Sequence, residues 1–209
     1  MKKDCSFDSE AESFDSESET ITTLEEKPKQ HIENISLIKS IFIILSTILE
    51  HNKTLPNYKD TLKKQRNICF NSNSKPDISL YEYLVRIQKY SLIEKNTFIS
   101  ALVYIDRFCK KSNIILTYYN IHRIISAAVL ISIKFNEDLF FDYEHYSKIA
   151  GIKKSELKDI EYNFYCMCDF NLFISEETFE KYSSCLNSTF EKHHENKSSS
   201  NSKIIELYL

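Results

Sequence analysis

The chain has 209 residues, of which 42% are hydrophobic, a size and composition suited to one folded domain with tails. It contains one glycine, Gly151, and three prolines. Because β-rich and βαβ folds need many glycines in turns, this composition favours helices, and it excludes a glycine-rich phosphate-binding loop. The net charge of −3 is concentrated in residues 1–30, and the near-neutral remainder gives nucleic acid no strongly basic face to bind.

Residues 1–30 are predicted to form a disordered, acidic, serine-rich tail, because they contain few large aliphatic side chains to bury. The pentapeptide SFDSE occurs twice in this stretch, and Ser9 and Ser16 each lie three residues before a glutamate. The two serines are therefore candidate sites for phosphorylation by an acid-directed kinase. The alternative is a tail that is only solvated.

Residues 31–51 are predicted to form an amphipathic helix, since their apolar side chains recur at helical spacing: Ile38, Ile41, Phe42, Leu45, Ile48 and Leu49. The continuous apolar run is much shorter than the roughly 20 residues that span a bilayer. We therefore expect this helix to dock on the folded body and not to enter a membrane. Residues 52–76 are expected to be a polar linker.

Five further helices are predicted, at about 79–91, 94–110, 118–136, 143–150 and 155–168. The third is apolar on nearly all sides, which predicts that the other helices enclose it. Asp142 is placed to cap the fourth helix and Gly151 to end it, while Ser175 is placed to cap a final short helix. Residues 187–209 are expected to be a loose polar tail, and the fold class is all-α.

Motifs that carry chemistry are missing from the sequence, so neither catalytic residues nor a cofactor are predicted. The six cysteines have no repeating spacing, which favours free thiols in a reducing interior. Cys166 and Cys168 could recruit zinc together with His193 and His194, but buried thiols beside a polar tail are the favoured interpretation. No metal site is therefore predicted.

Residues 76–182 contain, in order, PDISLYEYLVRIQKY, ALVYIDRF, NIHRIISAAVLISIKFNED, DYEHYSKIAGIKKSELKDIEYNF and CDFNLFISEETFEKY. In order, spacing and helix pattern these segments resemble a single cyclin box. The motifs YIDRF, HYSKIAGI and SELKDIE resemble the P/U-type cyclins, the phosphate-signalling group. The resemblance implies a five-helix cyclin box over residues 77–186, built around the central apolar helix. It also implies an extra N-terminal amphipathic helix and a short C-terminal helix.

The resemblance assigns kinase binding to Lys134, near the end of the third helix of the box, and to Glu161, in the fifth. Both are expected to lie beside one groove, in the interface and not in the core, where each can bond backbone groups of a partner. The alternative is that Lys134 only occupies a helix C-terminus, where the helix dipole favours a cation, and that Glu161 is an ordinary surface residue. Asp106 is interpreted as structural, paired with a basic group on an adjacent helix.

Five more residues are proposed around the same groove. Phe135, Leu157 and Phe164 could form its apolar floor, although each could instead belong to the core. Glu137 and Asp138 follow the third helix, where acidic groups are unfavourable to the helix dipole. They are interpreted as partners for arginines of the kinase activation segment.

The resemblance implies a non-catalytic regulatory subunit that binds a cyclin-dependent serine/threonine kinase as a heterodimer. Activation would follow from holding helix C of the kinase in its active position. The alternative is a cyclin-fold adaptor or scaffold that docks protein partners without activating a kinase. Neither nucleic acid nor membrane is an expected partner, and the expected location is intracellular, in the nucleus, the cytoplasm or both.

Overall fold

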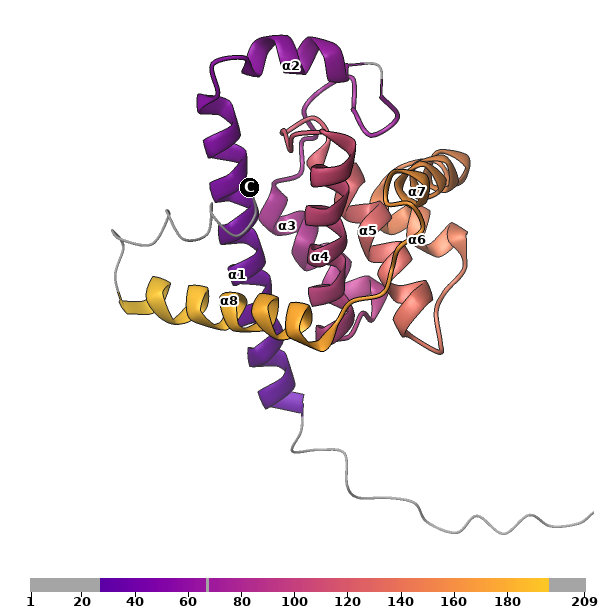
Figure 1. Ribbon diagram of the computed structural model, residues 1–209. Coiled ribbons are helices and arrows are strands. Elements are labelled where there is room, and N and C mark those ends of the chain that lie inside the picture. The colour runs from indigo at the N-terminus through magenta and orange to yellow at the C-terminus, as the bar shows by residue number, and fades with distance from the viewer. Residues whose placement is uncertain (1–26, 67, 196–209) are drawn as a thin grey trace, which may run out of the picture.

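A computed structural model describes residues 27–66 and 68–195, and these ranges contain helices and no strand (Figure 1). The predicted phosphorylation candidates, Ser9 and Ser16, lie outside the described residues. The helices in chain order are α1 Lys27–Thr54, α2 Tyr58–Gln65, α3 Leu80–Ser91, α4 Lys95–Ser112, α5 Ile121–Asn136, α6 Tyr143–Ala150, α7 Lys154–Met167 and α8 Glu176–Glu195. Five of them, α3 to α7, correspond to the predicted cyclin box.

Helix α5 is the centre of the molecule and packs against α4, α6 and α7. Small side chains allow its neighbours to approach closely: Ala127, Ala128 and Ser132 are all 0% exposed. The hydroxyl of Ser132 also donates a hydrogen bond to the carbonyl of Thr97 in α4, at 2.6 Å. The prediction of a central helix enclosed by the others is therefore confirmed.

The ends of α6 are fixed by the residues that the sequence singled out. The side chain of Asp142 accepts a hydrogen bond from the backbone N–H of His145 at 2.9 Å, so one free donor of the first turn is satisfied. Gly151 ends the helix with a φ of +71°, a conformation that glycine adopts without a steric penalty. The cap at Asp142 makes Tyr143 the first residue of α6, and Gly151 makes Ala150 the last.

Helix α1 is docked on the body, as the sequence predicts, with α3 along one side and α8 across another (Figure 1). Its apolar residues Ile38, Ile41, Leu45, Ile48 and Leu49 are all buried. Phe42 is partly buried and meets Tyr81 of α3 edge to face, with the ring centroids 5.5 Å apart.

By length and composition alone, the segment Ile35–Thr54 of α1 could cross a bilayer. Half of this segment is buried inside the fold, and the core helix of a soluble protein can have the same length and apolar composition. We therefore interpret α1 as a core helix.

The predicted polar linker, residues 52–76, is more structured than expected. It contains α2, and Phe70 beyond it is 0% exposed. The Phe70 ring packs edge to face on Phe108, with centroids 4.9 Å apart, and also contacts Phe164. The prediction failed here because one aromatic anchor within a polar stretch carries no periodicity, yet it is enough to hold the segment on the core.

Helix α8 is also longer than the short C-terminal helix that was predicted, with 20 residues reaching Glu195. Its backbone therefore includes residues 187–195, which were assigned to the loose tail. One face packs on α1 and α4, through the buried Tyr182, Leu186 and Thr189. These buried residues recur at helical spacing, but they are few, and the polar residues between them concealed the pattern in the sequence.

Asp106 is held differently from the prediction. Its cation is Lys110, on the same helix α4 with Nζ–Oδ2 at 3.2 Å, and not a basic group of an adjacent helix. The adjacent helix α8 supplies a hydroxyl instead, because Tyr182 donates to the same Oδ2 at 2.7 Å.

The docking of α1 can be tested with Leu45→Asp, because Leu45 is 1% exposed and a carboxylate there would be buried among apolar groups. We expect a loss of about 3 kcal/mol or more in the free energy of unfolding, or aggregation. The matched control is Ile35→Asp on the same helix, at a position that is 39% exposed, which should remain close to wild type. Urea unfolding followed by circular dichroism measures both, and a Leu45→Asp protein as stable as wild type would show that α1 is not part of the core.

Candidate functional site

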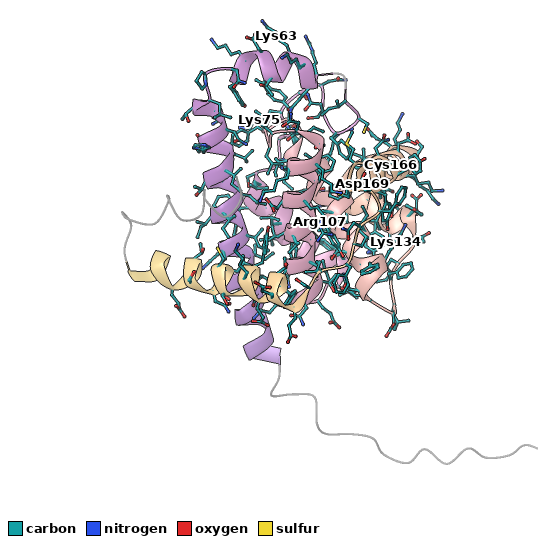
Figure 2. All side chains as sticks on the ribbon, in the orientation of Figure 1. Lys63, Lys75, Arg107, Lys134, Cys166 and Asp169 are labelled. Carbon is teal, nitrogen blue, oxygen red and sulfur yellow. The ribbon has the colours of Figure 1, made fainter. Side chains whose placement is uncertain are left out.

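Lys134 and Glu161 form an ion pair where α5 and α7 meet. Lys134 lies in the last turn of α5, and its Nζ is 2.7 Å from Oε1 of Glu161 in α7. Figure 2 shows Lys134 on the side of the molecule that α6 and α7 occupy, away from α1. The Lys134 side chain is 22% exposed, whereas Glu161 is only 4% exposed. The expectation that both lie outside the core is therefore wrong for Glu161, because its carboxylate has an internal cation that allows burial.

Tyr143 of α6 completes this cluster and was not singled out from the sequence. Its hydroxyl donates to Oε2 of Glu161 at 2.5 Å and accepts from Nζ of Lys134 at 2.6 Å. Nζ of Lys158 lies 4.9 Å from the centre of the Tyr143 ring, a cation–π distance. The cap at Asp142 indicated where Tyr143 lies along α6, but nothing in the sequence gave the angle at which α6 meets α5 and α7.

The charge states of the cluster follow from its contacts. Burial disfavours the ammonium of Lys134, but the hydrogen bonds that this ammonium donates to Glu161 and Tyr143 outweigh burial, and the pKa of Lys134 is raised. Burial and the neighbouring Glu161 also raise the pKa of Tyr143. At neutral pH the lysine is therefore charged and the tyrosine hydroxyl keeps its proton.

The cluster has hydrogen-bonding capacity left over. A lysine ammonium has three N–H donors, and Lys134 uses two of them on Tyr143 and Glu161. Because the Lys134 side chain is partly exposed, its third donor can reach an acceptor on another molecule. The buried carboxylate of Glu161 fixes the position of the Lys134 ammonium through their ion pair.

An exposed apolar segment, residues 135–141, begins immediately after Lys134. Phe135 is 55% exposed, Leu139 89%, Phe140 52% and Phe141 41%. A large apolar area on a surface typically marks an interaction site, and aromatic side chains contribute strongly to such contacts. The segment therefore places a candidate docking surface directly beside the polar cluster.

The two acidic residues of this segment differ from each other. Glu137 accepts a hydrogen bond from the backbone N–H of Glu94 at 3.0 Å. Glu94 is the N-cap of α4, so the Glu137 carboxylate lies at the positive end of that helix dipole. This contact explains an acidic residue at position 137 without a partner protein, whereas Asp138 is exposed.

Leu157 and Phe164 belong to the core. They are 1% and 0% exposed, and the Phe164 ring stacks on Phe108 with centroids 4.5 Å apart. Of the two roles that the sequence left open, the geometry supports the core for these residues. Only Phe135 of the three is available at the surface.

Among the side chains that the structure describes, no group of three or more His, Cys, Asp or Glu could hold a metal ion. Cys168 is buried, and burial raises its thiol pKa to about 11. The side chains of His193 and His194 lie outside the described part of the chain.

Comparison with known proteins agrees with this fold. Residues 8–172 match the family model described as Cyclin. Cyclin-U4-1 of Arabidopsis thaliana is 31% identical over 159 residues, which cover 74% of this chain and 78% of the relative. PHO85 cyclin-7 of Saccharomyces cerevisiae is 28% identical over 205 residues, covering 89% of this chain and 72% of the relative. Cyclin-U4-3 of Arabidopsis thaliana is 33% identical over 148 residues, covering 70% of this chain and 65% of the relative.

The chain therefore belongs to the cyclin family. The names of its relatives agree with the P/U type that its sequence motifs predict. The chain spans less than two thirds of the length of Cyclin-U4-3, at 65%.

The ion pair predicts that removal of Lys134 alone destabilises the fold, and that neutralising Glu161 as well restores stability. Lys134→Ala removes the cation from a carboxylate that is 4% exposed and should lower the free energy of unfolding by about 3 kcal/mol. Adding Glu161→Gln to Lys134→Ala removes the unpaired charge and should restore most of that loss. Urea unfolding of the two variants measures the difference. Equal stability of Lys134→Ala and wild type would contradict the assigned ion pair.

Proposed function

We propose that this chain is a regulatory subunit that binds and activates a cyclin-dependent serine/threonine protein kinase. The supporting observation is the cluster of Lys134, Glu161 and Tyr143, which presents one spare ammonium donor beside the exposed aromatic residues of segment 135–141. Membership of the cyclin family supports the same proposal. Two relatives, one in Saccharomyces cerevisiae and one in Schizosaccharomyces pombe, carry the name PHO85 cyclin or PHO85 cyclin-like.

The proposed contact combines two kinds of interaction. Lys134 donates to a backbone carbonyl of the kinase, while Phe135 and its apolar neighbours cover the contact and exclude water. A charged hydrogen bond that is shielded from water discriminates strongly against poorly fitting partners. Asp138 remains the candidate for a kinase cation.

Activation follows from preference for one kinase conformation. A protein kinase orients ATP only when the glutamate of its helix C pairs with the lysine of its third strand. A subunit that binds the inward position of helix C more tightly than the outward position raises the active population. Binding without that preference would give the adaptor that the sequence left as the alternative.

The interface is tested by replacing the polar pair without leaving a buried charge. The double variant Lys134→Met, Glu161→Gln keeps the side-chain volume and should unfold within about 1 kcal/mol of wild type. Loss of the charged contact should weaken binding at least tenfold, measured with a kinase that co-purifies with the wild-type chain. Phe135→Ser should weaken binding similarly and leave stability unchanged, since Phe135 is 55% exposed.

The matched control is the exposed pair Lys63 and Asp60 on α2, far from the proposed interface. Lys63→Met, Asp60→Asn should retain wild-type affinity and wild-type stimulation of phosphotransfer. Unchanged affinity in both interface variants would refute the proposed surface. Normal affinity of the wild-type chain with no stimulation of phosphotransfer would support the adaptor.

A further inference from the structure

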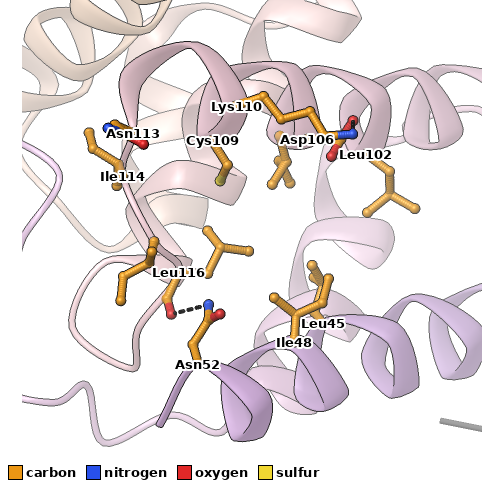
Figure 3. A pocket seen from close by; sticks show the side chains of 12 residues that line it. Leu45, Ile48, Asn52, Leu102, Asp106, Cys109, Lys110, Asn113, Ile114 and Leu116 are labelled. Carbon is orange, nitrogen blue, oxygen red and sulfur yellow. Dashed lines mark hydrogen bonds and ion pairs between the residues drawn. The ribbon is translucent and has the colours of Figure 1, made fainter. Parts of the chain in front are cut away.

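A pocket of about 300 Å³ lies between α1, α4 and the loop that follows α4 (Figure 3). Leu45 and Ile48 of α1 form one wall, and Leu102 of α4 faces them from the other. Two other lining residues, Lys110 and Asn113, are exposed, so the pocket reaches the surface. It is remote from the candidate site, because α1 lies on the other side of the molecule from α6 and α7 (Figures 1 and 2).

The lining of this pocket is mainly aliphatic, and it includes Ile105 of α4 together with Ile114 and Leu116 of the loop. Such walls favour an apolar occupant, since removal of apolar surface from water is favourable. A cavity of about 150 Å³ with similar walls holds one benzene ring, so about 300 Å³ accommodates two side chains of that size. The walls fit any apolar group of that size, and the sequence after α8 supplies one.

Helix α8 brings the part of the chain that follows it close to this pocket. It packs on both α1 and α4, the helices that form the two walls (Figure 1). The hydroxyl of Tyr182 in α8 donates to Oδ2 of Asp106, a lining residue, at 2.7 Å. Glu195, the last residue of α8, lies about 20 Å further along the helix axis than Tyr182. The chain therefore leaves α8 about one pocket's length from the edge of the pocket.

The sequence after α8 has two parts of opposite character. Residues 196–202, NKSSSNS, are all polar, a composition typical of linkers. Residues 203–209, KIIELYL, follow them, and five of their side chains are apolar: Ile204, Ile205, Leu207, Tyr208 and Leu209. An apolar cluster of this kind is unfavourable in water, so it is expected to pack against another surface.

The connection is long enough to return to the pocket. Residues 196–203 span at most about 28 Å when extended, which exceeds the distance of about 20 Å back along α8 to Tyr182. A segment held on so short a connection has an effective concentration in the millimolar range. A second copy or another protein would have to bind much more tightly than the chain's own segment to displace it.

We propose that residues 204–209, which follow the described part of the chain, dock in this pocket as an intramolecular strap. At least two of their apolar side chains fill the space between α1 and α4. Glu206, the one acidic side chain of the segment, then lies beside Lys110, a cation at the rim that is 50% exposed. The strap attaches the chain beyond α8 to both helices on which α8 itself packs.

The first experiment replaces Tyr208 of the full chain with the photo-cross-linking residue p-benzoylphenylalanine. Irradiation in dilute solution, followed by peptide mass spectrometry, identifies the residues to which position 208 becomes attached. We expect an intramolecular product joined to the pocket walls, within residues 45–52 or 102–116. The matched control carries the same group in place of Ser199, in the polar linker, and should give at least tenfold less of this product.

The second experiment measures thermal unfolding of the full chain by circular dichroism. Ile205→Asp, Leu207→Asp places two carboxylates where apolar side chains are buried, and it should lower Tm by about 4 °C or more. The matched control is Ser199→Asp, Ser200→Asp, which adds the same two charges to the polar linker. We expect this control to keep the wild-type Tm.

The proposal is overturned if position 208 becomes attached only to a second copy of the chain, which would make the occupant another molecule. Attachment to neither pocket wall would place the segment elsewhere and leave the pocket to a different partner. An unchanged Tm in the Ile205→Asp, Leu207→Asp chain would also exclude the contact. Both measurements are made without a kinase, so the proposed function is tested separately.

Discussion

The enclosure of α5 is the constraint on which the rest of the fold depends. A helix that is apolar on nearly every side is stable in water only when other helices cover all its faces. Helices α4, α6 and α7 pack directly on it, and close contact is possible because Ala127, Ala128 and Ser132 offer little volume. Only the last turn of α5 emerges from this enclosure, and that turn carries Lys134 and Phe135. Because the rest of α5 must be covered by other helices, its exposed last turn determines where the candidate surface site lies.

The sequence predicted those features that repeat or that have a local chemical cause. Apolar periodicity located α1 and the helices of the box, and Asp142 and Gly151 set the ends of α6. The sequence did not predict features that depend on a single long-range contact. Phe70 anchors a polar segment through rings of α4 and α7, and no sequence pattern indicates such an anchor. The sparse apolar face of α8 was concealed in the same way.

Some features of the candidate site were likewise predictable from the sequence, and others depended on long-range packing. Resemblance pointed to Lys134 and Glu161, but not to the difference in their exposure, because exposure depends on the depth at which α7 packs on α5. The bridging hydroxyl of Tyr143 comes from a third helix, and its place depends on the angle between helices. By contrast, the exposure of Phe135 follows from its position at the end of α5, beyond the part that the neighbouring helices cover.

The polar cluster of Lys134, Glu161 and Tyr143 is hydrogen-bonded within the fold, and this bears on how it can bind a partner. At Lys134 every buried oxygen has a donor, so the ammonium is held in place before any partner arrives. A side chain ordered on folding does not lose its rotamer freedom again on association, a loss that typically costs about 0.5–1.5 kcal/mol. A preorganised donor at the surface suits a large partner that supplies its own acceptor.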